Sequence, residues 1–411
     1  MKDRAFEKKY EAARKEYRYY GVDTDRALRR LRKISLSVHC WQADDVTGFE
    51  IRKTRDACVS DIRPTGDFPG KPRNIRELRR DLEKTLTLIP GRHRISLHAI
   101  YGDFGRRAVD RDEIGIEHFR SWTDWAKRLD IGLDFNATCF NHPMVRDGYT
   151  LSSVKKEVRE FWIEHVRRCR RIAAFFGREL KTPCLHNLWI PDGAKDITVF
   201  RHRHRQLLRE SLDRIYAQRF PASQIVDSLE SKLFGIGSEY YQVGSHEFYL
   251  GYAMKNKLIP CLDLGHFHPT ESVADKISGI LPFFKGLVIH VSRGVRWDSD
   301  HVVILDDELE NLTAEIVRAD ALERVYLALD FFDATLNRIA AYVIGVRALL
   351  KALLIALMMP DAGLQALEKT GNKAAFLARH ESLKNLPWGA IWDYYCLKNN
   401  VPTDREWIPG L

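Results

Sequence analysis

The sequence lacks several features that would place it in familiar classes of protein. Its 411 residues contain no uninterrupted run of 18 or more apolar residues, and Met1–Arg4 leads into a charged stretch without an apolar signal segment. We therefore expect neither a membrane-spanning helix nor a secretory signal. No Gly-rich fingerprint follows a predicted strand, so no dinucleotide cofactor is expected. No repeat of fixed period is visible, which argues against a solenoid.

Cysteine is sparse and scattered. The seven cysteines are an odd number, and no two of them form a CxxC pair. A disulfide framework and a cysteine-bound structural zinc are therefore not expected, and a reducing compartment such as the cytoplasm fits better.

The net charge of +9 is not concentrated in one segment. The 65 basic residues are interleaved with 56 acidic ones along helical stretches, which is typical of solvated, ion-paired helix faces. The densest basic run, Arg201–Arg205, is short and leads into a predicted helix. Nucleic acid is therefore not an expected partner.

Short apolar runs alternate with amphipathic helical stretches along the chain. The runs are Ile34–His39, Arg94–His98, Ile131–Phe135, Cys184–Trp189, Ile225–Glu230, Ile259–Asp263, Gly286–His290 and Val325–Asp330. Alternation of strands and helices predicts parallel strands with crossover helices, and eight such units predict closure into a (β/α)₈ barrel, the TIM-barrel architecture. An open doubly wound sheet remains the alternative, because strand count does not prove closure.

Most of these runs end in a side chain that can carry chemistry. The terminal residues are His39, His98, Trp189, Glu230, Asp263, His290 and Asp330. In a barrel all C-terminal strand ends surround one mouth, where active sites of this architecture lie. Solvated strand ends would account for one or two such residues, but not for seven.

Two further segments flank or interrupt the alternation. Residues 42–72 have little regular pattern, and a loop of this length predicts either a lid over the mouth or a plain surface insertion. Beyond the eighth strand the chain reads as helical, with Trp388 and Trp392 spaced i,i+4. We expect a catalytic barrel over residues 1–345, with an N-terminal helix, and a C-terminal helical extension over residues 346–411.

The last four strands predict a divalent-metal centre. Its candidate ligands are Glu230, Asp263, His266, His290, Asp298, Asp300 and Asp330. Five carboxylates and two imidazoles in one mouth would repel one another strongly without cations. Oxygen-rich ligation with some imidazole suits Mn²⁺, Mg²⁺ or Co²⁺. Seven ligands fit two cations that share a bridging carboxylate better than one cation.

When each pair of candidate ligands is considered alone, a simpler interpretation than metal binding is available. Asp298 and Asp300 would point the same way from an extended segment, but such a pair is most often a solvated loop. Asp263 and His266 leave a strand at i and i+3, although a single strand histidine is more often a core residue. The combination over four successive strand ends carries the prediction.

Four other residues are candidates for contact with a substrate. Lys232 shares one side of an extended chain with Glu230 and could stabilise developing negative charge on a substrate oxygen. His98 could bond a sugar oxygen or assist ring opening, and it could equally be a core histidine. Trp189 and Phe135 could pack against sugar C–H surfaces, although aromatic residues at strand ends are also ordinary core residues.

Several motifs resemble the L-rhamnose isomerase family. They are His39–Gln42, Leu97–Tyr101, Trp189–Gly193, Glu230–Gly235, Gly265–Glu271, His290–Arg293, Arg296–Val303 and Leu329–Ala334. The resemblance runs from about residue 10 to about residue 408. These long motifs are specific to that family rather than to barrels in general.

The resemblance implies a cytoplasmic homotetramer that interconverts L-rhamnose and L-rhamnulose, the first step of rhamnose breakdown. It implies a structural metal held by Glu230, Asp263, His290 and Asp330, where Co²⁺, Mg²⁺ or Zn²⁺ are alternatives to Mn²⁺. It implies a second, catalytic metal, usually Mn²⁺, held by His266, Asp298 and Asp300, with Asp263 as a candidate bridge. Lys232, His98 and Asp330 would be the catalytic residues.

The site layout is also similar to that of xylose isomerase. In that family a strand-end carboxylate and a histidine share the i,i+3 spacing of Asp263 and His266, and a lysine follows a ligand carboxylate by two residues, as Lys232 does. We expect a metal-assisted 1,2-hydride shift, and a cis-enediol route through a carboxylate base is the alternative. A metal-dependent hydrolase or epimerase and a catalytically silent sugar-binding barrel are the rival function classes.

Overall fold

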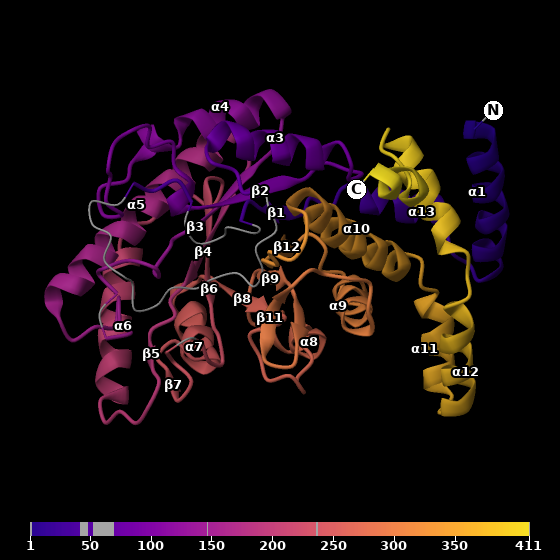
Figure 1. The fold of residues 1–411 in the computed structure, drawn as a ribbon. Helices are drawn as coiled ribbons and strands as arrows, with labels where there is room; N and C mark the ends of the chain where they lie inside the picture. Colours follow the sequence, from indigo (N-terminus) through magenta and orange to yellow (C-terminus); the bar gives the residue numbers. More distant parts are fainter. Residues whose placement is uncertain (1, 42–47, 52–69, 146, 236, 411) are drawn as a thin grey trace.

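A computed structural model of the protein describes residues 2–41, 48–51, 70–145, 147–235 and 237–410. The side chains of residues 2, 3 and 298–300 fall outside that description. Figure 1 shows a barrel of strands wrapped by helices, and beside it an arm of helices that carries both ends of the chain.

Eight parallel strands form one closed barrel in the order β1-β12-β9-β8-β6-β4-β3-β2. They are β1 (Ser37–His39), β2 (Arg94–His98), β3 (Leu133–Asn136), β4 (Cys184–Trp189), β6 (Ile225–Glu230), β8 (Ile259–Asp263), β9 (Leu287–Val291) and β12 (Val325–Leu329). Because β1 pairs with both β2 and β12, the ring closes. The barrel prediction is confirmed, and the open-sheet alternative is wrong.

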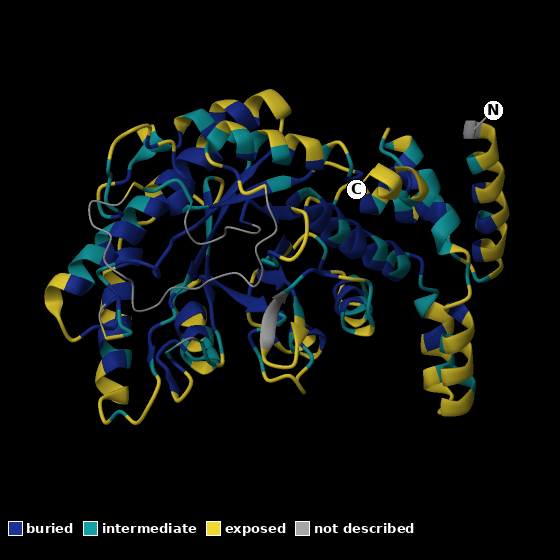
Figure 2. Ribbon diagram, viewed as in Figure 1, coloured by how far each residue is buried: buried dark blue, intermediate teal, exposed yellow. Residues whose placement is uncertain are grey.

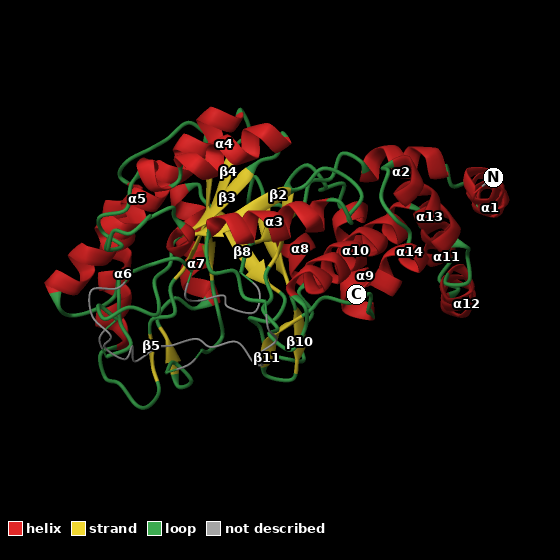
Figure 3. Ribbon diagram, turned by 45° about the horizontal axis from the view of Figure 1, so that its top comes forward, coloured by secondary structure: helices red, strands yellow, loops and turns green. Residues whose placement is uncertain are grey.

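The ends of some strands differ from the predicted ones. The first strand begins at Ser37 rather than Ile34. Leu36 donates its N–H to the His93 ring, at 3.2 Å, instead of to a neighbouring strand. Within the described ranges, four short strands lie outside the barrel and form two antiparallel pairs (Figure 3). They are β5 (Gly193–Ala194) with β7 (Tyr241–Gln242), and β10 (Arg293–Val295) with β11 (Asp298–His301).

Helices surround the barrel and turn their apolar faces toward it. They are α3 (Ile75–Leu86), α4 (Arg120–Leu129), α5 (Lys156–Leu180), α6 (Arg201–Tyr216), α7 (His246–Asn256), α8 (Ala274–Ile280), α9 (Asp307–Arg318) and α10 (Arg338–Leu357). In α3 the buried residues Leu78, Leu82 and Thr85 recur at helical spacing. Asn74 begins this helix by accepting the N–H groups of Arg76 and Glu77.

The barrel interior is partly apolar and partly polar. Its apolar part is a separate cluster made by Leu185, Ile259, Cys261 and Val288, with half-buried Val226. At the N-terminal strand ends, Asp134 pairs with Arg94 at 2.8 Å, and their side chains are only 3% and 16% exposed. Asp134 also accepts the Ser37 hydroxyl at 2.6 Å and the Leu185 N–H at 2.8 Å. This nearly dry ion pair closes the lower end of the barrel.

The C-terminal segment is helical, as predicted, and it packs against the N-terminal helix. Its helices are α11 (Asp361–Lys369), α12 (Lys373–Leu383), α13 (Trp388–Lys398) and α14 (Asp404–Trp407). In Figure 1, α13 lies beside α1 (Lys2–Tyr19), and the rings of Tyr10 and Tyr394 stack 4.0 Å apart. Helix α2 (Thr24–Leu31) then returns the chain toward the barrel.

Helix α10 joins the barrel to this arm. It is long and apolar enough to cross a membrane, but 78% of its most apolar window is buried inside the protein, and Figure 2 shows it as largely dark blue. Its Arg347 donates to Asp404 at 2.8 Å and to the Leu88 carbonyl at 2.7 Å. The predicted division at residues 345–346 lies within this helix, and the division into two domains stays a prediction.

The ion pair at the lower end of the barrel gives a stability prediction. Asp134→Ala is expected to lower the free energy of unfolding by about 3–5 kcal/mol, because Arg94 would remain as a buried charge without its partner. Urea unfolding followed by circular dichroism measures this change. As a control, Glu160→Ala breaks a surface pair with Arg214, whose side chains are 41% and 44% exposed. That change is expected to cost about 1 kcal/mol or less, and equal losses in the two variants would contradict the prediction.

A candidate metal centre at the barrel mouth

Four side chains from four adjacent strands converge at the C-terminal end of the barrel. Glu230 ends β6, Asp263 ends β8, His290 lies in β9, and Asp330 follows β12. One ligand atom from each of them lies within 4.8 Å of all the others. Because these strands are consecutive in the barrel, closure alone brings the four side chains together.

The donor set fits a divalent cation. Oε1 of Glu230 and Nδ1 of His290 are buried and, within the described part of the chain, make no well-directed hydrogen bond. His290 Nδ1 lies 3.0 Å from an oxygen of Asp330 and 3.3 Å from one of Glu230. Three carboxylates and one imidazole are ligands suited to Mn²⁺, Mg²⁺ or Co²⁺. Buried polar atoms that lack hydrogen bonds are costly unless they bind a ligand such as a cation.

The pKa shifts in this cluster also indicate that its electrostatic environment favours positive charge. Burial raises the pKa of Glu230, but the imidazoles of His290 and His266 outweigh this effect and hold it well below its usual range. Burial raises the pKa of Asp263 to about 6, and the nearby carboxylates add to the rise. Burial lowers the pKa of His290, yet its negative neighbours raise it well above the usual value. A divalent cation bound among these carboxylates would supply the positive charge that they favour.

Two neighbours orient the carboxylates. Asn187 donates its side-chain N–H to Oε2 of Glu230 at 2.5 Å, and it accepts the Ser228 hydroxyl at 2.9 Å. The Ser292 hydroxyl donates to Oδ1 of Asp263 at 2.8 Å. Ligands held in this way from behind keep their remaining oxygens aimed at one point.

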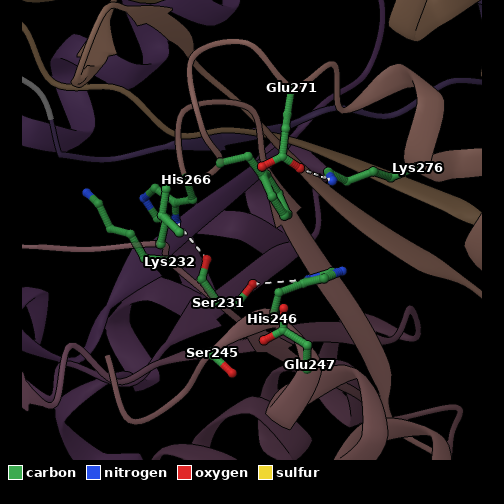
Figure 4. A pocket seen from close by; sticks show the side chains of 10 residues that line it. Ser231, Lys232, Ser245, His246, Glu247, His266, Glu271 and Lys276 are labelled. Carbon is green, nitrogen blue, oxygen red and sulfur yellow. Dashed lines mark hydrogen bonds and ion pairs between the residues drawn. The ribbon is translucent and has the colours of Figure 1, made fainter. Parts of the chain in front are cut away.

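His266 lies beside the four-residue cluster. Its Nδ1 is 3.0 Å from Oε1 of Glu230 and 3.2 Å from the Ser231 carbonyl, and its Nε2 is 4.0 Å from Asp263. Figure 4 shows His266 and Lys232 on one side of Ser231, with His246 on the other. These four side chains line a pocket of about 210 Å³, together with Glu271, Lys276 and others.

The other two predicted ligands of the second metal lie on a hairpin next to His266. Asp298 and Asp300 belong to β11, which pairs with β10, but their side chains lie outside the described residues. A Cβ atom added to Gly294 in β10 would lie 3.7 Å from the Cα of Gly265, which immediately precedes His266. The backbone therefore carries both aspartates on a hairpin that packs against the loop of His266.

Aromatic rings line the opposite side of the mouth. Consecutive ring centroids in the series Trp41, His98, Phe140, Trp189 and His266 are 4.6, 5.7, 5.3 and 6.0 Å apart. Nε1 of Trp41 donates to Asp330 at 2.9 Å, and this bond connects the series of rings to the four-residue cluster. Nζ of Lys232 lies 5.8 Å from the centroid of Trp189. The mouth thus has a charged side and an aromatic side, which matches a polyol with one apolar face.

Phe135 lies elsewhere, which contradicts its predicted contact with substrate. Its ring is fully buried against Phe119 and Phe176, between the sheet and the helix layer. Successive strand residues face opposite sides, so Asn136 enters the barrel, where it donates to the Ser96 hydroxyl at 2.8 Å. Phe135 therefore belongs to the outer core.

Several residues at the mouth are absent from the sequence prediction. Asn187, Ser292 and Trp41 each stand two positions from a predicted strand end, so strand alternation alone could have found them. Phe140 lies in the loop after β3, and nothing in its sequence context marks it. The predicted lid over residues 42–72 falls mostly outside the described residues; only 48–51 and 70–72 belong to the described part.

Comparison with known proteins gives one family. The family model described as L-rhamnose isomerase (RhaA) matches residues 4–411. The L-rhamnose isomerase of Rhodopirellula baltica is 51% identical over 405 residues, which cover 98% of this chain and 94% of that protein. The L-rhamnose isomerase of Enterobacter sp. is 52% identical over 405 residues, with 98% and 96% coverage.

Among solved structures, a putative xylose isomerase from Rhodospirillum rubrum aligns with a TM-score of 0.47 and 12% identity, over 77% of this chain and 98% of that one. The sequence matches are far stronger, and they span nearly the whole chain. With the family model, they lead to one conclusion: this chain belongs to the L-rhamnose isomerase family and is an isomerase of aldose and ketose sugars.

Proposed function

We propose that the protein interconverts L-rhamnose and L-rhamnulose with two divalent cations, Mn²⁺ at the catalytic position, by a 1,2-hydride shift. The observation that supports the metal proposal is the convergence of Glu230, Asp263, His290 and Asp330 within 4.8 Å. Family membership supports the substrate proposal. Family resemblance also supports a homotetramer in the cytoplasm, which light scattering and cell fractionation would test.

The proposed ligands form two groups. Glu230, Asp263, His290 and Asp330 would hold the structural cation, and His266, Asp298 and Asp300 the catalytic one, with Asp263 as the candidate bridge. Bound there, divalent cations would act as Lewis acids on the oxygens of the open-chain sugar. Trp41 and Asn187 would keep Asp330 and Glu230 from turning away, since each donates to one carboxylate oxygen.

The remaining roles belong to the aromatic side and to Lys232. In the forward reaction, hydrogen leaves C2 with its electron pair and bonds to C1, while the proton lost from O2 is balanced by one gained at O1. Lys232 is proposed to donate to O1 as negative charge develops there. Trp189 and Phe140 would exclude water and pack against the sugar, and His98 would bond one of its oxygens.

Removal of metal provides the first test of function. Protein treated with EDTA and dialysed is expected to lose nearly all conversion of L-rhamnose to ketose, and added Mn²⁺ is expected to restore it. A ketose assay and elemental analysis of the same samples measure both quantities. Full activity in protein that carries less than a tenth of a metal ion per chain would overturn the metal proposal.

The proposed role of Lys232 in the isomerisation can be tested by removing its donor. Lys232→Met keeps the length of the side chain but removes the donor, so kcat is expected to fall about 10²–10³-fold, the usual loss of one such donor. Metal content is expected to stay unchanged. Lys255→Met, at an exposed position on α7, is the matched control and should keep full activity. A Lys232→Met protein that retains the wild-type kcat for L-rhamnose would contradict the proposed donation from Lys232 to O1.

An isotope experiment separates the hydride shift from the enediol route. Reaction in D₂O is expected to give L-rhamnulose whose C1 is nearly free of deuterium, because a hydride transferred directly does not exchange with solvent. Mass spectrometry and proton NMR of the product measure the label. L-rhamnulose incubated in D₂O without enzyme corrects for spontaneous exchange, and extensive enzyme-dependent labelling would establish the enediol route instead.

A further inference from the structure

A fully buried arginine lies behind the aromatic side of the mouth. Arg111 belongs to the segment between the short helices η1 (Ala99–Tyr101) and η2 (Ile116–His118), and it is 1% exposed. A guanidinium has five N–H donors, and all five are used here. Two go to the carboxylate of Glu50 at 2.8 and 3.1 Å, and three go to the carbonyls of Thr138, Phe140 and Asn141 at 2.6, 2.5 and 3.1 Å.

These three carbonyls belong to the loop that follows β3, and this loop supplies part of the mouth. Oγ1 of Thr138 lies 2.9 Å from Nδ1 of His98. The ring of Phe140 lies between those of His98 and Trp189, at 5.7 and 5.3 Å. Arg111 therefore holds the backbone of the loop that carries Thr138 and Phe140.

A second contact fixes the same loop from α5. Nε2 of His165 accepts the N–H of Thr138 at 3.1 Å, and its Nδ1 lies 3.0 Å from the carbonyl of Arg111. A neutral imidazole has one acceptor and one donor, which is what these two partners require. Burial lowers the pKa of His165 to about 3, and the charge of Arg111 adds to the effect, so the ring stays neutral. The backbone of Thr138 is therefore held on both sides.

The contact with Thr138 bears on which nitrogen of His98 carries the proton. Among the described residues, the Thr138 hydroxyl has no hydrogen-bond partner other than His98 Nδ1. A hydroxyl can donate to a ring nitrogen or accept from a ring N–H, and when it donates to Nδ1 the hydrogen of the neutral ring lies on Nε2. Burial lowers the pKa of His98 to about 4, so the ring is neutral near pH 7. With its hydrogen on Nε2, His98 offers a donor rather than a base.

We propose that Thr138 and Arg111 are positioning residues of the sugar site. They hold His98 as the Nε2–H tautomer, so that it donates a hydrogen bond to an oxygen of the bound sugar. Glu50, which lies on a separate segment, neutralises the charge of Arg111. That segment is itself held by a hydrogen bond from the Phe49 N–H to the Ile100 carbonyl, at 2.8 Å. The inference rests on the proposed conversion of L-rhamnose at this mouth.

The tautomer can be read without any activity measurement. In protein labelled with ¹⁵N-histidine, the His98 signals are assigned by their loss in His98→Phe. Wild type and Thr138→Ser are expected to show an Nε2-protonated, neutral ring, and Thr138→Val a mixture of the two tautomers. An Nδ1-protonated His98 in the wild type would overturn the proposal, whether or not the enzyme acts on L-rhamnose.

Kinetics then test whether Thr138 acts through His98. Thr138→Val is expected to lower kcat/KM for L-rhamnose about tenfold, as the loss of one positioned hydrogen bond does. Thr138→Ser is expected to stay within about twofold of the wild type. In a His98→Phe background, Thr138→Val should have almost no further effect, because the nitrogen it orients is gone. Equal losses in the two backgrounds would overturn the proposal.

Two more variants complete the design. Arg111→Lys cannot supply five directed donors, so it is expected to lower kcat/KM at least as much as Thr138→Val while metal content stays unchanged. If Arg111→Lys does not fold, the Thr138 and His98 variants decide. Thr313→Val removes another buried threonine hydroxyl, on α9, and is expected to leave kcat/KM unchanged. An inactive wild type would reject the proposed function alone, because the tautomer is measured separately.

Discussion

The structure is organised around the mutual repulsion of carboxylates that the fold forces together. Once eight strands close into a ring, Glu230, Asp263 and Asp330 are held close together, because each stands at or just beyond the C-terminal end of a barrel strand. Burial makes that repulsion stronger, and the same negative charges raise the pKa values of His290 and His266. The strand ends thus create a point that favours a cation, and the surrounding residues determine where the cation would sit and which oxygens face it.

The charged side and the aromatic side of the mouth have different roles. On the charged side, Asn187, Ser292 and Trp41 each occupy one carboxylate oxygen and leave another available. On the aromatic side, rings in contact exclude water and offer an apolar surface to a sugar. The polar layer below the mouth and the Asp134–Arg94 pair at the lower end show that this barrel satisfies its polar interior by internal pairing.

The sequence predicted the barrel and the ligand cluster because both follow from strand ends. The last inward-facing side chain of each barrel strand reaches the mouth. An error of two or three residues at the N-terminal end of a strand, such as the predicted start at Ile34, therefore does not affect the prediction of the site. The prediction for Phe135 was wrong because the predicted strand ended one residue too early, and a shift of one residue exchanges the inner and outer faces of a strand. Phe140 and Arg111 act from loops, whose course depends on tertiary contacts that no local pattern records. For Asp298 and Asp300, the structure places the hairpin backbone, and their ligand role stays a proposal.

The pairing of the two chain ends has a consequence for how the protein is made. Helix α1 packs on a partner far along the chain, because the surface that stacks on Tyr10 is carried by α13, near residue 394. Strand β1 likewise needs β12 before the ring can close. The aromatic face of α1 therefore stays uncovered until the segment around residue 394 has been made and has folded. A chain truncated before residue 388 would expose that face, and exposed hydrophobic surface makes an incompletely folded chain prone to aggregation.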